Sequence, residues 1–239
     1  MSASFYILRH KQRLLLWQLS ARHQLIAHWR MLLHVAIPAS FTNMLNPLAS
    51  ALLMTIFAGL GHEVVAAFGA APRIETLLLI VTMALGSVLA PFVSQNYGAG
   101  YPARANSALL RAMGFSLLFQ LAVYGMIWLS APLIARQFSQ EPRIIALIVY
   151  YLRLVPLGYG LQGAAILLAS ALNGAKASKI SLLLNLIRLF AFILPSAWVG
   201  AKLGAEQGVF WGILIANVSF GLFAWTYAYY RFPLLFRKT

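Results

Sequence analysis

Long apolar runs alternate with short polar segments along nearly the whole chain of 239 residues. A helix needs about 20 apolar residues to cross the hydrocarbon core of a bilayer, and these runs reach that length with few or no charges. Backbone polar groups in lipid must be hydrogen-bonded within their own segment, and no alternating strand pattern is visible, so we predict helices. The predicted spans are approximately residues 32–60, 64–94, 112–135, 144–172, 180–200 and 208–230.

The composition agrees with this pattern, since 62% of the residues are apolar and only 9% are charged. Soluble domains carry about 25% charged residues, and a globule of this length has too little interior to hide so much apolar surface. We therefore predict an all-α integral membrane protein with six transmembrane helices. Cysteine is absent, which excludes disulfides and thiolate metal sites.

Basic residues are far more frequent than acidic ones: 18 Lys and Arg face four glutamates, and the formal net charge is +14. In a soluble domain this excess would suggest a nucleic-acid partner, but here the basic residues follow the loops. Most fall on the side that holds both termini, whereas Arg136, Arg143 and Lys202 fall on the other side. Since cytoplasmic loops collect Lys and Arg, we expect a multi-pass protein of the inner (plasma) membrane with cytoplasmic termini and no nucleic-acid partner.

The predicted spans divide the chain into three parts. Residues 1–30 mix basic and apolar side chains near the helical period, which predicts an amphipathic arm in the cytoplasm or the membrane interface. Residues 31–232 contain the transmembrane lobe, and residues 233–239 form a basic cytoplasmic tail.

The stretch APFVSQNYGAGYPARA, which begins at Ala90, follows an apolar span directly. A phosphate-binding loop would need a strand before its glycines and a helix N-terminus after them. Here Gly98 and Gly100 can end one helix and Pro102 can start the next, so we interpret the stretch as a connector on the cytoplasmic side.

Ionisable side chains inside the spans are costly and are therefore candidates for function. Glu75 is the only carboxylate within the predicted spans, about a dozen residues into its helix. It could exchange a proton or hold a cation, or it could form a structural ion pair with Arg153 or Arg188 from another helix. Arg73 is a poor partner, because residues two apart do not face each other on a helix.

Amides and prolines also lie within the spans. Asn43, Asn46, Gln162 and Asn185 could coordinate a cation or bind a ligand, although hydrogen bonding between helices is their usual role. Proline removes a backbone hydrogen bond and bends a helix, which suits a cavity that opens and closes but occurs in static bundles too. The prolines within the spans are Pro38, Pro47, Pro156 and Pro195.

Enzyme chemistry has little support in the sequence. No GxSxG, HExxH or Walker motif is present, and no pair of histidines within the spans has metal-ligand spacing. We therefore expect neither an enzyme, a metal site nor a cofactor.

Three stretches, taken in order, resemble the second half of the multidrug and toxic compound extrusion (MATE) transporters. They are IPASFTNMLNPLASALLMTIFAGLGHEVVAAFGAAPRIETL, SQNYGAGYPARA and ASALNGAKASK, and the resemblance covers about residues 32–232. It implies one of two six-helix lobes with a substrate cavity between them. It also implies export of lipophilic, often cationic compounds in exchange for Na+ or H+.

The resemblance also indicates where some branches of the family carry carboxylates in this lobe. Counting from Pro38, one such position is Asn46, and a second position, before Gly174, is Gln162. Both carboxylates are missing, and other branches place the coupling aspartate in the other lobe. The resemblance therefore implies that the coupling site lies outside this chain. Our candidate residues for the substrate or ion pathway are Asn43, Asn46, Arg73, Glu75, Gln162 and Arg188.

Several functional interpretations remain open at this point. The leading hypothesis is the C-terminal half of an efflux antiporter, incomplete without its N-terminal lobe and inactive alone. A second is a half-transporter that dimerises with a second copy of itself. A flippase for lipid-linked oligosaccharides would suit the intramembrane arginines, and a membrane assembly subunit without transport activity is a further alternative.

Overall fold

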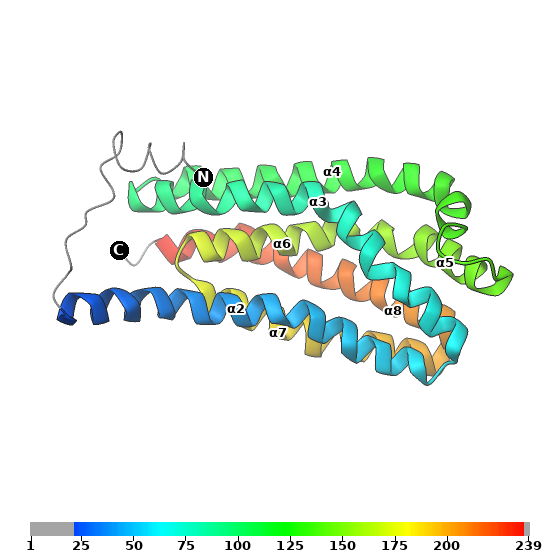
Figure 1. Cartoon of the computed structure of the whole chain (residues 1–239). Helices are drawn as coiled ribbons and strands as arrows, with labels where there is room; N and C mark the ends of the chain where they lie inside the picture. Colours follow the sequence, from blue (N-terminus) through cyan, green and yellow to red (C-terminus); the bar gives the residue numbers. More distant parts are fainter. Residues whose placement is uncertain (1–21, 237–239) are drawn as a thin grey trace, which may run out of the picture. The chain divides into compact units, whose positions relative to one another are not determined.

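The computed structural model describes residues 22–236, and every regular element within this range is helical (Figure 1). This confirms the all-α class. The elements are α2 (Arg22–Ala58), α3 (His62–Gly98), α4 (Pro102–Ala135), α5 (Pro142–Leu154), η2 (Val155–Gly158), α6 (Tyr159–Gly174), α7 (Ser178–Ile187), η3 (Arg188–Ile193), α8 (Leu194–Tyr230) and η4 (Phe232–Phe236). Most of the predicted amphipathic arm and the end of the basic tail lie outside the described residues, and both stay predictions.

Residues 22–36 and residues 37–236 belong to separate compact units. The first of these is the beginning of α2, with exposed apolar side chains such as Leu25, Ile26 and Trp29. All contacts described below lie within the second unit.

Five helical runs in the described chain are long and apolar enough to cross a membrane. The last of them, Ser178–Tyr230, has 53 residues, which is far longer than one crossing requires. Its backbone leaves the helical region at Gly204 (φ −148°, ψ 26°) and Ala205 (φ 47°, ψ −132°), within α8. The break divides this run into two arms of span length, which correspond to the predicted spans at 180–200 and 208–230.

The two arms of α8 run side by side with their backbones in contact. A Cβ atom at Gly200 would collide with the carbonyl oxygen of Gly208, and one at Gly212 would collide with that of Ser196. Only glycine permits so close an approach, as in other tightly packed membrane helices. We refer to residues 194–215 as the α8 hairpin.

Other helix boundaries differ from the predicted spans where local chemistry outweighs hydropathy. Helix α3 continues to Gly98, Gly100 adopts φ 75°, and α4 begins at Pro102, ahead of the predicted residue 112. The connector interpretation of this stretch is thus consistent with the backbone. The predicted span 144–172 is interrupted at η2, where Pro156 cannot donate to the preceding turn.

Helix α6 is the central element, with α3, α4, α7 and α8 packed against it. Two apolar clusters lie on either side of its midpoint. The first joins the end of α2, the first part of α3, α5 and the α8 hairpin through aromatic side chains including Phe57, Phe68 and Phe210. The second joins the remainder of α3, the first part of α4 and the end of α8.

Candidate functional site

The single carboxylate of the spans lies opposite an amide on the central helix. Gln162 of α6 donates a hydrogen bond from Nε2 to Oε1 of Glu75 on α3 at 2.6 Å. Gln162 is only 4% exposed, and Glu75 is partly buried. A carboxylate can only accept, so this contact fixes which end of the Gln162 amide faces Glu75.

The other end of this amide has no partner. Gln162 Oε1 is buried and accepts no hydrogen bond in the structure. Buried polar atoms are almost always satisfied, and each exception needs an explanation. Oxygen atoms of amides and carboxylates are ligands for hard cations, and both accept from a protonated group. The pair Glu75–Gln162 is therefore suited to hold a cation or a proton.

Arg188 lies close enough to Glu75 for their charges to interact, although the two do not form a salt bridge. It begins η3, a π-helical segment of six residues between α7 and α8. Short π segments inside α-helices are rare and occur frequently at functional sites. The structure thus brings three predicted residues together: Glu75, Gln162 and Arg188.

Two tyrosines complete the cluster, and sequence reasoning missed them. The hydroxyls of Tyr151 on α5 and Tyr159 on α6 are 2.9 Å apart, and both side chains are buried. Both interact electrostatically with Glu75. The available signal in the sequence is Pro156, which lies in the η2 segment between the two tyrosines. We call Glu75, Gln162, Arg188, Tyr151 and Tyr159 the charged cluster.

The remaining candidates lie elsewhere. Asn43 on α2 and Arg73 on α3 are exposed, so they do not join the charged cluster. Asn46 is in α2, and its side chain is outside what the structure describes. Asn185 donates to the carbonyl oxygen of Ser181 in its own helix at 2.9 Å.

The alternative pairing of Glu75 with Arg153 is wrong. The Arg153 guanidinium lies 4.8 Å from the centre of the Trp128 ring, and its Nε donates to the Trp128 carbonyl oxygen at 3.4 Å. Tyr124 in turn donates to the carbonyl oxygen of Arg153 at 3.0 Å. Arg153 is exposed and held on α4, because a flat guanidinium stacks well on an indole ring.

A second buried polar group lies further along α3. Thr82 and Ser116 have their hydroxyls 3.0 Å apart, and Gln120 donates to Thr82 Oγ1 at 3.2 Å and to the Leu78 carbonyl oxygen at 2.9 Å. None of these side chains has a buried atom without a partner. We call Thr82, Ser116 and Gln120 the neutral cluster.

The family model described as MatE matches residues 38–199 of the chain. The chain is 39% identical over 222 residues to a protein of Shewanella oneidensis named FAD transporter, covering 93% of this chain and 49% of that protein. It is 26% identical over 239 residues to the probable multidrug resistance protein YpnP of Bacillus subtilis, covering 95% of this chain and 50% of YpnP.

Solved structures of transporters have the same fold over about half of their length. The MATE transporter VcmN of Vibrio cholerae in its bent form aligns with a TM-score of 0.83 at 28% identity, covering 93% of this chain and 49% of VcmN. A MATE structure in the straight conformation aligns with a TM-score of 0.85 at 22% identity, over 100% of this chain and 54% of its own. The chain therefore spans about half the length of the relatives it matches.

Proposed function

The chain belongs to the MatE family of multi-pass membrane transporters, which are not enzymes, and we propose that it forms one lobe of a two-lobed exporter. We further propose that the exporter moves lipophilic, often cationic compounds out of the cell in exchange for Na+ or H+. The observation that carries the coupling part of this proposal is the Glu75–Gln162 hydrogen bond beside the unpartnered Gln162 Oε1.

We propose that the charged cluster takes the place of the carboxylate that the family resemblance implied was missing. The resemblance indicated a carboxylate at position 162, where this chain has glutamine. Glu75 reaches the same place from α3 and accepts a hydrogen bond from that glutamine. We propose that the coupling carboxylate of this chain is supplied by α3 and not by α6. Since Arg188 interacts with Glu75, binding of a cation or proton there changes the charge balance inside the lobe.

The partner in the proposal is a second lobe, either an N-terminal lobe of the kind that the relatives have or a second copy of this chain. The chain covers 49% of the Shewanella relative, and the resemblance implies that substrate lies between two lobes. Arg73 and Asn43 support this arrangement, because they are polar, exposed and located in predicted spans. Such side chains in membrane helices face a cavity or a protein partner rather than lipid. We propose that α2 and α3 face the partner lobe and that both termini lie in the cytoplasm.

A second substrate class is favoured by the Shewanella relative. That protein is named FAD transporter, and its 39% identity exceeds the 26% of the multidrug resistance protein YpnP. A flavin dinucleotide is aromatic and carries a negatively charged diphosphate. The exposed Arg73 provides a positive charge that attracts such a substrate. The same charge does not attract a lipophilic cation.

Transport by the chain in reconstituted vesicles tests the proposal directly. The chain is reconstituted alone and together with the half of the Shewanella relative that it does not match. Efflux of a fluorescent lipophilic cation and of FAD is then followed under an imposed Na+ or H+ gradient. We expect transport only when both halves are present, and its loss in Glu75→Gln but not in the matched control Glu141→Gln, since Glu141 is exposed.

The outcomes separate the alternatives. Gradient-driven efflux by this chain alone would indicate that a second copy of the chain takes the place of the second lobe. Gradient-dependent efflux that survives Glu75→Gln would overturn the assignment of coupling to the charged cluster. FAD efflux without efflux of the cation would establish the second substrate class.

A further inference from the structure

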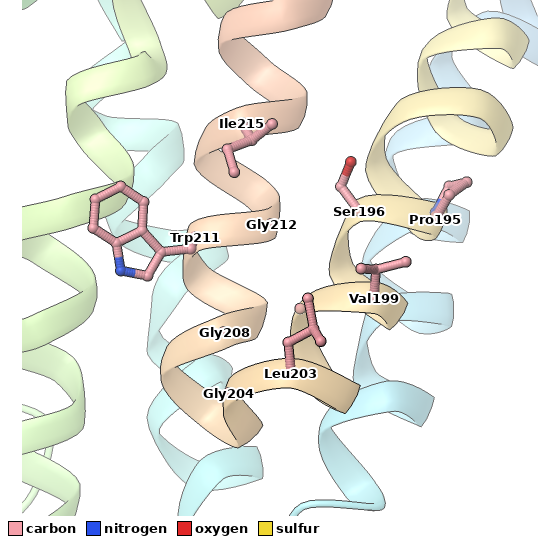
Figure 2. Close-up of a pocket in the computed structure, with 10 residues that line it drawn as sticks. Pro195, Ser196, Val199, Leu203, Gly204, Gly208, Trp211, Gly212 and Ile215 are labelled. Atoms are coloured by element: carbon pink, nitrogen blue, oxygen red, sulfur yellow. The ribbon is translucent and has the colours of Figure 1, made fainter.

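An apolar groove runs along the α8 hairpin, away from the charged cluster. Figure 2 shows side chains from both arms around it, with Gly204, Gly208 and Gly212 on the backbone between them. The cavity has a volume of about 450 Å³. It is lined by Pro195, Ser196, Val199, Gly200, Leu203, Gly204, Gly208, Trp211, Gly212 and Ile215. The walls are open to the surroundings: Leu203 is 84% exposed and Ile215 is 54% exposed.

The dimensions of the groove match one leaflet of a bilayer. From Gly204 to Ile215 the second arm rises about 16 Å at 1.5 Å per residue, close to half of the roughly 30 Å hydrocarbon core. Only two of the lining side chains carry a polar atom: Ser196 has a hydroxyl, and Trp211 has an indole nitrogen. That nitrogen donates to the Tyr150 hydroxyl at 3.0 Å, which fixes Trp211 as one wall.

Interfacial residues mark the end of the groove at the turn of the hairpin. Lys202 is exposed, and its Nζ lies 5.8 Å from the centre of the Trp198 ring. Tryptophan and lysine at the end of a membrane helix are typical of the head-group level. Lys202 makes no salt bridge within residues 22–236, although Glu206 lies on the same turn. A positive charge is therefore available where the apolar groove meets the membrane surface.

Other features of the hairpin favour lipid over a protein partner in this groove. Membrane helices associate through small residues that let backbones approach. The Cβ positions of Gly200, Gly208 and Gly212 face the backbone of the opposite arm, so these glycines serve the contact between the two arms and not the approach of a third helix. The exposed polar side chains Arg73 and Asn43 lie on other helices, and the groove has none of comparable kind.

We propose that the α8 hairpin binds a phospholipid, with one acyl chain in the groove and the phosphate group beside Lys202. The bound lipid lies in the groove along the line where the two arms meet and stabilises the hairpin at its Gly204 turn. Every phospholipid carries this phosphate, so the site selects for a phosphate head group with an extended chain and not for one particular lipid.

Photocrosslinking in bilayers tests this proposal with the full chain. The probe is a phosphatidylethanolamine that carries a diazirine midway along one acyl chain, and the modified residues are mapped by mass spectrometry. Exposed residues of α4 report ordinary surrounding lipid; they are Leu118, Met126 and Leu129. We expect the crosslinking yield at Leu203 and Ile215 to be about fivefold higher than at these α4 residues. The ratio is modest because an acyl chain that moves from bulk lipid into the groove gains only better packing.

Two matched variants distinguish specific lipid binding in the groove from ordinary contact with surrounding lipid. Gly204→Leu fills the groove, and a Cβ atom there has no atom within 4 Å. Gly125→Leu adds the same side chain at an equally open glycine on α4. We expect Gly204→Leu to reduce the groove yield to that of α4, and Gly125→Leu to leave it unchanged. If Gly204→Leu fails to fold, Val199→Trp fills the groove from its wall instead.

The head group is tested separately. Lys202→Gln should lower the yield from the phospholipid probe by a few-fold and leave that of a diazirine fatty alcohol, which lacks phosphate, unchanged. Equal yields in the groove and on α4 would overturn the proposal by showing surrounding lipid alone. Crosslinks from groove residues to another protein chain would overturn it in favour of a helix partner.

Discussion

Helix α3 carries two buried polar clusters about two turns apart, and they differ in almost every physical respect. The neutral cluster joins Thr82 to Ser116 and Gln120 on α4, and no buried atom in it lacks a partner. The charged cluster joins Glu75 to Gln162 and leaves Gln162 Oε1 unpartnered. Satisfied neutral networks fix helix packing, whereas an ionisable and incompletely satisfied group inside a membrane protein indicates function.

The helices around the two clusters differ in the same way. The neutral cluster lies between uninterrupted stretches of α3 and α4. The charged cluster adjoins the 3-10 segment η2 and the π segment η3, where the regular hydrogen-bond pattern changes. Broken helices can rearrange at lower cost than continuous ones, because their backbone bonds are already redistributed. We therefore distinguish a part of the lobe with continuous helices from the part with interrupted helices, where we propose that the ion binds.

The largest expected effect comes from removing the charge. In the vesicle assay with both lobes, Glu75→Gln should reduce gradient-driven efflux to background, because a neutral amide cannot exchange a proton or balance a cation. Thermal unfolding of this variant should stay close to that of the parent chain. Retained gradient dependence in Glu75→Gln would remove the functional difference between the clusters.

The next largest effect, on stability, is expected at Gly163, the glycine of α6 that lies against the neutral cluster. A Cβ atom at Gly163 would collide with Ser116 Oγ and lie 3.2 Å from Thr82 Cγ2. Gly163→Val should therefore lower the free energy of unfolding by about 3 kcal/mol, the upper range for overpacking. Denaturant titration in micelles measures this, with Gly114→Val as control, since a Cβ atom at Gly114 meets nothing within 4 Å. Equal effects in the two variants would contradict the close packing.

Gln120→Leu should have a smaller effect, on stability alone. It removes the hydrogen bonds from Gln120 to the Leu78 carbonyl oxygen and to Thr82. Interhelical bonds of this kind contribute about 1 kcal/mol in membrane proteins, so the free energy of unfolding should fall by about that amount. The Na+ or H+ dependence of transport should not change, and a changed dependence would place the neutral cluster in the ion pathway.

Tyr151→Phe should have the smallest effect on stability. It removes one hydroxyl of the pair at 2.9 Å while keeping the ring against Phe210. We expect a loss of about 0.5 kcal/mol in the same unfolding assay. The ion concentration for half-maximal transport should rise, because Tyr159 and Glu75 lose a neighbouring polar group. An unchanged ion requirement would exclude the tyrosines from the site.

Hydropathy was sufficient to predict the helical class and the approximate positions of the spans, because the bilayer imposes length and apolarity on each one. Breaks within helices were less predictable. Pro156 indicated a bend, and the gap between the predicted spans 180–200 and 208–230 located the turn at Ala205, but the π segment at Arg188 has no residue pattern that distinguishes it from continuous helix.

The charged cluster was only partly predictable for a similar reason. Glu75, Gln162 and Arg188 stood out as polar residues in apolar spans, but which arginine lies near Glu75 depends on helix packing. The sequence analysis did not single out Tyr151 and Tyr159, whose hydroxyls are brought together by the packing of α5 against α6 across η2. The groove of the α8 hairpin depends on how two arms pack together, and the glycines at 200, 204, 208 and 212 indicate only that helices approach closely there.

Infrared titration of the carboxyl groups in the reconstituted chain tests directly whether Glu75 binds the coupling ion. The chain has only four acidic side chains, and Glu75 is the one in the interior of the lobe, so its C=O stretching band can be assigned with Glu75→Gln. We expect a band that changes with pH or with added Na+, disappears in Glu75→Gln and persists in Glu141→Gln. A Glu75 band that responds to neither pH nor Na+ would contradict the assignment of ion binding to the charged cluster.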